Sequence, residues 1–107
     1  MTAIGIFGAR GRMGQAIAGL AADAGLTIAG GTDSQAGGTI GAEGAPITAD
    51  PAALAASADV LIDFSVPAAL DAHLAACIAA SKPLLIGTTG LEAEHQARID
   101  VAARSIP

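Results

Sequence analysis

Three glycines near the start of the chain have the spacing of a loop that binds a pyrophosphate. Gly8, Gly11 and Gly14 follow the apolar run at residues 3–7 and precede a segment with helical periodicity. The first glycine allows a sharp turn, the second lets the backbone approach a phosphate, and the third lets the new helix pack closely. Unpaired N–H groups at the start of that helix suit the anion. The candidate contacts are Gly8, Ala9, Arg10, Gly11, Arg12 and Met13.

Basic residues are scarce in this chain, and two of them lie in that loop. The chain has five Lys and Arg against ten Asp and Glu, for a net charge of −5, yet Arg10 and Arg12 both fall between the first and third glycines. The net charge argues against nucleic acid or an anionic membrane as partner, whereas local donors still suit a small anionic ligand. The alternative interpretation is an ordinary strand-to-helix turn with exposed arginines, because 14 glycines in 107 residues make the spacing easy to meet by chance.

An acidic residue follows the second expected strand. Asp33 lies nineteen residues after Gly14, where a carboxylate accepts hydrogen bonds from the ribose hydroxyls of NAD. The 2′-phosphate of NADP would meet this negative charge, and Ser34 supplies no cation, so the sequence favours NAD. Arg10 or Arg12 could reach such a phosphate, which keeps NADP possible. The alternative role for Asp33 is a local Asx-turn.

The segment Gly87-Thr88-Thr89-Gly90 follows directly after the apolar strand at 84–86, which we expect to be buried. Glycines that flank two hydroxyls suit the close approach of a ligand with polar anchoring. A turn that caps the last helix explains the same residues equally well.

The two histidines and the single cysteine lack the sequence neighbours that a catalytic group needs. His73 falls within an expected helix, His95 lies on an expected solvated face, and neither has a nucleophile or a set of metal ligands beside it in the sequence. Cys77 is the only cysteine and lies on an apolar helix face, so we expect it in the core of a protein from a reducing compartment. We therefore assign no catalytic residue and no metal ligand.

The elements that must position these residues alternate between strand and helix. We expect strands at 3–7, 26–29, 47–48, 60–62 and 84–86, with Gly30 and Gly31 closing the second strand and a loop over 34–46. The first helix is expected from the helical spacing of Met13, Ile17, Leu20 and Ala24, and Gly25 stands where it would end. Further helices are expected from Pro51, with Asp50 as N-cap, and over 92–104. Another begins at Pro67, with one stripe formed by Leu70, Leu74, Cys77 and Ile78.

This alternation predicts one α/β domain over residues 1–107. The expected architecture is a Rossmann-like, doubly wound parallel sheet in three α/β/α layers, and ligands bind such sheets beyond the carboxyl ends of the strands. The strand ends near Phe64 and Ile86 therefore join the candidate site. No apolar stretch is long enough to span a bilayer and no leader pattern opens the chain, so we expect a cytoplasmic protein without membrane contact.

Three segments together resemble one enzyme family. These are the run from Ile4 to Gln15, Asp63-Phe64-Ser65-Val66-Pro67, and Ile86-Gly87-Thr88-Thr89-Gly90. They look like the dihydrodipicolinate reductases, also called 4-hydroxy-tetrahydrodipicolinate reductases, and the match runs the length of the chain. The resemblance implies an NAD(P)H-dependent oxidoreductase that passes a hydride to a cyclic dicarboxylate and releases water, in the diaminopimelate route to lysine.

The resemblance also implies roles for single residues. The glycine loop would hold the pyrophosphate and Asp33 the ribose, Phe64 and Ser65 would border the cofactor, and Gly87, Thr88 and Thr89 would line its nicotinamide end, with Thr89 nearest the substrate. Ser34 and Val66 stand where the family often has a basic residue, which again favours NAD.

The family's paired histidines, its lysine and its Ser-Gly-Thr substrate loop have no match in this sequence. The resemblance therefore implies a cofactor-binding portion, truncated before the substrate domain, that is inactive alone and belongs to a homo-oligomeric enzyme. The alternatives are a non-enzymatic nucleotide-binding module, such as a redox sensor or a CoA-binding domain, and a fragment of an aspartate- or homoserine-type dehydrogenase. The dehydrogenases share the glycine loop, but Gly87-Thr88-Thr89-Gly90 is not expected in them.

Overall fold

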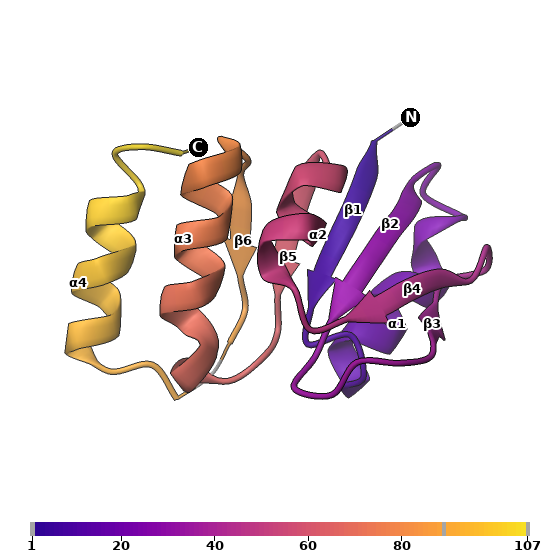
Figure 1. Ribbon diagram of the computed structural model, residues 1–107, viewed down its shortest axis with the longest axis horizontal. Helices are drawn as coiled ribbons and strands as arrows, with labels where there is room; N and C mark the ends of the chain where they lie inside the picture. Colours follow the sequence, from indigo (N-terminus) through magenta and orange to yellow (C-terminus); the bar gives the residue numbers. More distant parts are fainter. Residues whose placement is uncertain (1, 89, 107) are drawn as a thin grey trace.

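The computed structural model describes residues 2–88 and 90–106, and within them six strands form one sheet in the order β3-β4-β2-β1-β5-β6 (Figure 1). The strands are β1 (Ala3–Phe7), β2 (Thr27–Thr32), β3 (Thr39–Ile40), β4 (Ala45–Thr48), β5 (Val60–Asp63) and β6 (Leu84–Ile86). All neighbouring strands are parallel except β3 and β4, which are antiparallel. The sheet extends from β1 in both directions, through β2 on one side and β5 on the other, so the strand order reverses at the carboxyl end of β1.

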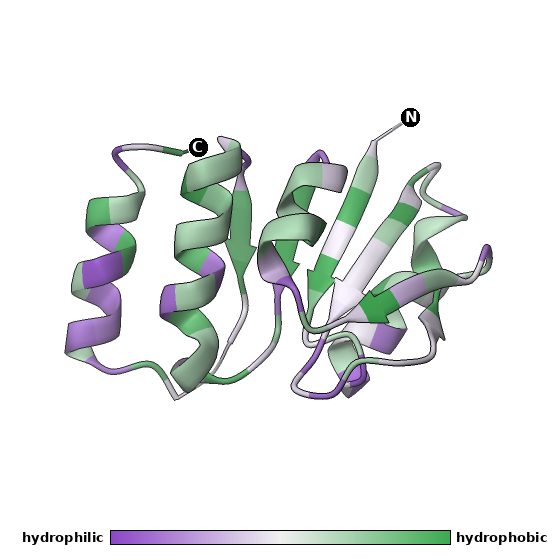
Figure 2. Cartoon of the chain, in the orientation of Figure 1, coloured by the Kyte–Doolittle hydropathy of each residue, from purple (hydrophilic) through white to green (hydrophobic). Residues whose placement is uncertain are grey.

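Helices cover both faces of this sheet, which confirms the three-layer arrangement. The helices are α1 (Arg12–Ala21), α2 (Pro51–Ser57), α3 (Leu70–Ala80) and α4 (Ala93–Ala102), with a 3₁₀ turn at Pro67–Ala69. On one face Ile4 and Ile6 of β1 belong to the same cluster as Ala18 of α1. On the other face Phe7 of β1 clusters with Leu54 of α2. Figure 2 shows β1, β5, β6 and α3 mostly hydrophobic and β2 paler, whereas α4 carries more hydrophilic residues.

The start of α2 follows the expected capping chemistry. Asp50 is the N-cap, and its carboxylate accepts the N–H of Ala53 at 3.2 Å. Pro51 occupies the first turn, where a missing N–H costs nothing.

The region around β2 corrects two expectations. β2 does not close at Gly30 and Gly31 but continues to Thr32, which pairs with Phe7 of β1 and Thr48 of β4. The expected loop over 34–46 contains β3 and the first two residues of β4. The strand has a glycine at position 31 because a neighbouring residue fills the space beside it: a Cβ on Gly31 would lie 2.4 Å from the Cβ of Ala9.

Two packing expectations were also wrong. α1 ends at Ala21 rather than Ala24, and it buries Gly14, Ala18 and Ala21, leaving Met13 50% and Leu20 66% exposed. Small residues face the sheet because the helix lies close to it. In β6, Leu85 is 62% exposed rather than buried, because α1 packs against the other half of the sheet on that face. No helix within residues 2–88 and 90–106 has both the length and the apolar character needed to cross a membrane.

Candidate functional site

The first glycine of the loop makes a turn that only glycine fits. Gly8 has φ +85°, and a Cβ there would lie 2.4 Å from the carbonyl oxygen of Phe64. The N–H groups of Gly8 and Ala9 both donate to the carbonyl oxygen of Thr32, at 2.9 and 3.0 Å. The turn is therefore fixed between the ends of β2 and β5. Ala9 is fully buried within it and presents no surface to a ligand.

The N-terminus of α1 opens directly from this turn. Gly11 is the N-cap, no side chain caps the helix, and its first turn has no acidic residue. The first N–H to bond back into the helix is that of Gln15, to Gly11 at 3.0 Å. A Cβ on Gly14 would lie 2.6 Å from the carbonyl oxygen of Gly8, so the third glycine lets α1 pack against the loop itself. This geometry leaves the N–H groups of Arg12 and Met13 without an intrahelical acceptor, as an anion site requires.

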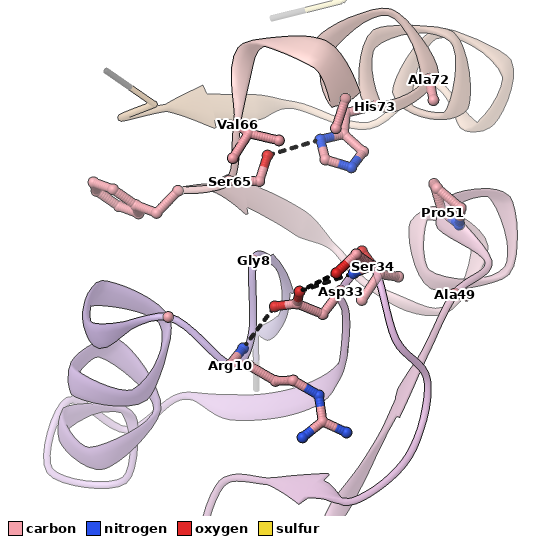
Figure 3. Close-up of a pocket in the computed structure, with 14 residues that line it drawn as sticks. Gly8, Arg10, Asp33, Ser34, Ala49, Pro51, Ser65, Val66, Ala72 and His73 are labelled. Atoms are coloured by element: carbon pink, nitrogen blue, oxygen red, sulfur yellow. Dashed lines mark hydrogen bonds between the residues drawn. The ribbon is translucent and has the colours of Figure 1, made fainter. Parts of the chain in front are cut away.

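Asp33 connects the end of β2 to the glycine loop. Its Oδ2 accepts the N–H of Arg10 at 3.0 Å, and its Oδ1 accepts the N–H of Ser34 at 2.8 Å (Figure 3). The carboxylate thus bonds to the residue directly after it, not two residues on as in an Asx-turn, and it also faces the glycine loop. The Arg10 guanidinium donates to the carbonyl oxygens of Gln35 and Gly37, which holds its charge beside the residues after β2.

A cavity of about 520 Å³ lies where these segments converge (Figure 3). It extends from the glycine loop across the ends of β2 and β5 to α3. The sequence-predicted residues that line it are Gly8, Arg10, Gly11, Asp33, Phe64 and Ser65. The structure does not bring Ala9, Arg12, Met13, Gly87 or Thr88 into its lining. Thr89 lies outside the described residues.

Gly87 and Phe64 pack directly on one another at the ends of β5 and β6. A Cβ on Gly87 would lie 2.1 Å from the Phe64 ring. The N–H of Gly87 donates to the carbonyl oxygen of Asp63 at 2.8 Å. Gly87 is therefore required by this packing whatever ligand the site takes.

A buried carboxylate joins the same two strand ends. Asp63 ends β5 and is 1% exposed. Its Oδ2 lies 2.7 Å from Nδ1 of His73, and its Oδ1 accepts the N–H of Ser65 at 3.0 Å and the hydroxyl of Ser65. The hydroxyl of Thr88 lies 3.1 Å from the same Oδ1. Burial alone would raise the pKa of Asp63, but the hydrogen bonds from His73 and Ser65 and the charge of His73 outweigh it, so the pKa of Asp63 is lowered.

These residues do not form a nucleophilic triad. In such a triad the histidine uses one ring nitrogen for the carboxylate and the other for the serine. Here both Ser65 Oγ, at 3.4 Å, and Asp63 Oδ2 lie nearest Nδ1 of His73. Ser65 instead donates to Asp63, so no base is poised to activate it.

The role of His73 is what the sequence interpretation missed. His73 is 5% exposed, and its partners lie eight and ten residues earlier in the chain. One signal was available: His73 falls on the apolar stripe that includes Leu70, Leu74 and Cys77, and a buried imidazole there needs a polar partner. Asp63, at the end of a buried strand, was the matching acid.

The other polar candidates have structural roles. His95 caps α4 through its Nδ1, which accepts the N–H of Glu92 at 2.9 Å. Cys77 is fully buried, and burial together with the charge of Asp63 raises its pKa to about 11. The described part of the chain holds no group of three or more His, Cys, Asp or Glu that could bind a metal ion.

Comparison with known proteins matches almost the whole chain to one family. The family model described as dihydrodipicolinate reductase, N-terminus, matches residues 2–107. The chain is 45% identical over 105 residues to 4-hydroxy-tetrahydrodipicolinate reductase from Zymomonas mobilis, and 42% identical over 104 residues to that from Acidiphilium cryptum. Each alignment covers 97% of this chain but only 39% and 37% of those proteins, so the chain spans about two fifths of their length.

A solved structure shares the fold. The dipicolinate-bound dihydrodipicolinate reductase from Paenisporosarcina sp. TG-14 superposes with a TM-score of 0.77 at 21% identity. The superposition covers 96% of this chain and 43% of that one. The Rossmann-like α/β architecture is thereby confirmed.

Proposed function

Because this chain belongs to the dihydrodipicolinate reductase family, whose N-terminal portion it matches, we propose that it is the cofactor-binding part of an enzyme that reduces 4-hydroxy-tetrahydrodipicolinate. The reaction transfers a hydride from NAD(P)H and gives tetrahydrodipicolinate and water, in the diaminopimelate route to lysine. The nicotinamide supplies the hydride, and the protein's part is to bind and orient it. A cytoplasmic location and a homo-oligomeric whole enzyme belong to the same proposal.

The observation that carries this proposal is the uncapped start of α1 beside the turn at Gly8. The N–H groups of Arg12 and Met13 fit the diphosphate of a dinucleotide, because they precede the first helical hydrogen bond and no acidic side chain lies in that turn. Gly8 and Gly11 line the adjoining cavity and complete the contact, and Arg10 lines the same cavity with its guanidinium held beside the residues after Asp33. Ala9 acts within this contact by packing against Gly31.

Asp33 is the proposed partner of the adenosine ribose. Its carboxylate lines the cavity beside the glycine loop, as hydrogen bonding to both ribose hydroxyls requires. We propose NAD as the favoured cofactor, because a 2′-phosphate would lie against this carboxylate. The Arg10 charge, held beside the same loop, lets NADP bind as well.

The nicotinamide end is assigned to the ends of β5 and β6. Phe64 and Ser65 line the cavity there, and Gly87 and Thr88 bond to Asp63 directly behind them. We propose that Thr89, the next residue, lies nearest the substrate. No residue of this chain is assigned as catalytic, so the isolated chain is expected to bind cofactor without turnover.

Titration of the chain with NADH, NADPH and coenzyme A, followed by nicotinamide fluorescence and calorimetry, tests the proposal. We expect both reduced cofactors to bind, NADH more tightly. Gly14→Ala is expected to weaken binding, because the new Cβ would lie 2.6 Å from the carbonyl oxygen of Gly8. Gly19→Ala, on the same helix with no atom within 4 Å of the new Cβ, is the matched control. Tight coenzyme A binding without a nicotinamide signal would overturn the proposal in favour of a CoA-binding module.

A further inference from the structure

We propose that His73 is a positioning residue for the cofactor site: its Nδ1–H orients the Asp63 carboxylate, which in turn holds Ser65 and Thr88 in place. The inference rests on the proposed function for the identity of the ligand. The hydrogen-bond network itself is present in the cofactor-free protein and does not depend on the proposed function.

His73 is itself held rigidly. Its ring stacks on Phe7 of β1, with centroids 3.9 Å apart and planes 4° apart, and its backbone lies within α3. With only 5% of the residue exposed, the imidazole has little freedom to turn. Nδ1 is therefore a fixed point, set by α3 and by the last residue of β1.

The Asp63 carboxylate needs a fixed donor to define its orientation. The terminal torsion of an aspartate is broad, so its own rotamer preference does not define the carboxylate plane. The 2.7 Å contact from His73 engages Oδ2, which leaves Oδ1 directed at the N–H and hydroxyl of Ser65. A carboxylate in this buried place without that donor would lose its strongest partner.

Asp63 connects in turn to the wall of the cavity. Ser65 lines the cavity, and its N–H is shared between Asp63 Oδ1 and Thr88 Oγ1, at 3.0 and 3.2 Å. Thr88 in turn lies 3.1 Å from Oδ1. One carboxylate oxygen therefore fixes the residues that follow β5 and those that follow β6, and both groups belong to the proposed nicotinamide end.

Two substitutions of His73 separate its donor from its ring. His73→Asn keeps an N–H near the position of Nδ1 but loses the stacking on Phe7. His73→Phe keeps a ring on Phe7 but removes the donor. Because His73 also lines the cavity, cofactor affinity alone would not distinguish positioning from direct contact. Amide hydrogen exchange at Ser65 in the cofactor-free protein makes that distinction.

We expect Ser65 exchange about tenfold faster and NADH affinity about tenfold weaker in His73→Phe, with a clearly smaller change in both for His73→Asn, which loses the stacking but keeps the donor. The loss from His73→Phe is also expected to shrink when Thr88→Val is already present, because the two changes act on one network. Equal losses in both His73 variants would show that the ring's packing matters and overturn the proposal. Unchanged Ser65 exchange in His73→Phe would overturn it as well.

Nitrogen-15 spectra of the wild-type imidazole give a test that needs no variant, should His73→Phe fail to fold. The proposal requires a proton on Nδ1 of His73, and an unprotonated Nδ1 would overturn it. Wild-type protein that binds neither NADH nor NADPH would instead refute the proposed function. The exchange and nitrogen-15 results would still decide the role of His73.

Discussion

The imidazole of His73 lies parallel to the ring of Phe7, with their centroids 3.9 Å apart. Phe7 is the last residue of β1, directly before the turn at Gly8, and His73 lies in α3 and bonds to the end of β5. This contact ties together two strand ends that border the cavity. Packed and hydrogen-bonded side chains behind the cavity wall therefore support the site.

Gly87→Ala is expected to weaken NADH binding by about tenfold or more, because displacing the Phe64 ring costs the kind of overpacking strain seen in cores. The new Cβ would lie 2.1 Å from that ring, which lines the cavity. Fluorescence titration measures the loss. Adding Phe64→Leu should relieve the collision, so a double variant no better than Gly87→Ala alone would contradict this explanation.

Arg10→Ala is expected to lower NADPH affinity about tenfold and NADH affinity much less, because a charged hydrogen bond to a 2′-phosphate is lost only with NADPH. The Arg10 guanidinium is held beside the loop after Asp33 by the carbonyl oxygens of Gln35 and Gly37. The measurement is the ratio of the two dissociation constants. Arg104→Ala removes the same charge from an exposed position near the C-terminal end of α4 and is the control. Equal losses for both cofactors would refute a role in discrimination.

Asp63 is expected to make the protein less stable in acid. Its pKa is lowered on folding, so the folded chain gives up this proton more readily than the unfolded chain does. Asp63 thus adds stability above about pH 4, where an unfolded Asp is ionised, and that stability disappears as the pH falls through the lower folded pKa.

Urea unfolding from pH 7 to pH 3 measures this contribution. Asp63→Asn should lower the free energy of unfolding at pH 7, and the gap to wild type should narrow in acid. Asp23→Asn removes a carboxylate from an exposed position and should follow the wild-type pH dependence. A constant gap between wild type and Asp63→Asn across the range would count against the assignment.

Cys77 is expected to resist thiol reagents in the folded protein. Its pKa of about 11 leaves roughly one thiolate in a thousand at pH 8, and the side chain is fully buried. Labelling should be slow in buffer and complete in denaturant, as mass spectrometry would report. Rapid labelling of the native chain would mean that α3 opens readily.

The order of the elements could be predicted because local signals mark most of their boundaries. Pro51 and Pro67 each open a helical segment, and apolar runs mark β1, β5 and β6. The glycine loop could be predicted for the same reason, since its turn, its helix start and its strand lie within fourteen residues. Asp33 reaches this loop because β2 lies next to β1.

What escaped prediction depends on contacts between distant segments. β3 is two residues long and exists only through pairing with β4, so no local pattern marks it. The exposure of Leu85 depends on which half of the sheet α1 covers. The pairing of His73 with Asp63 depends on how α3 is rotated about its axis over β5. Apolar periodicity indicates which face of a helix is buried, but it does not say which acid that face meets.

The strand order also determines when the cavity can form during translation. Translation makes the anchor for the diphosphate first, at Gly8, but the opposite wall of the cavity ends at His73, some sixty-five residues later. β5 must dock beside β1, the first of these six strands to be synthesised, before the two walls face each other. Cofactor capture on a stalled nascent chain would therefore report the moment at which α3 leaves the exit tunnel.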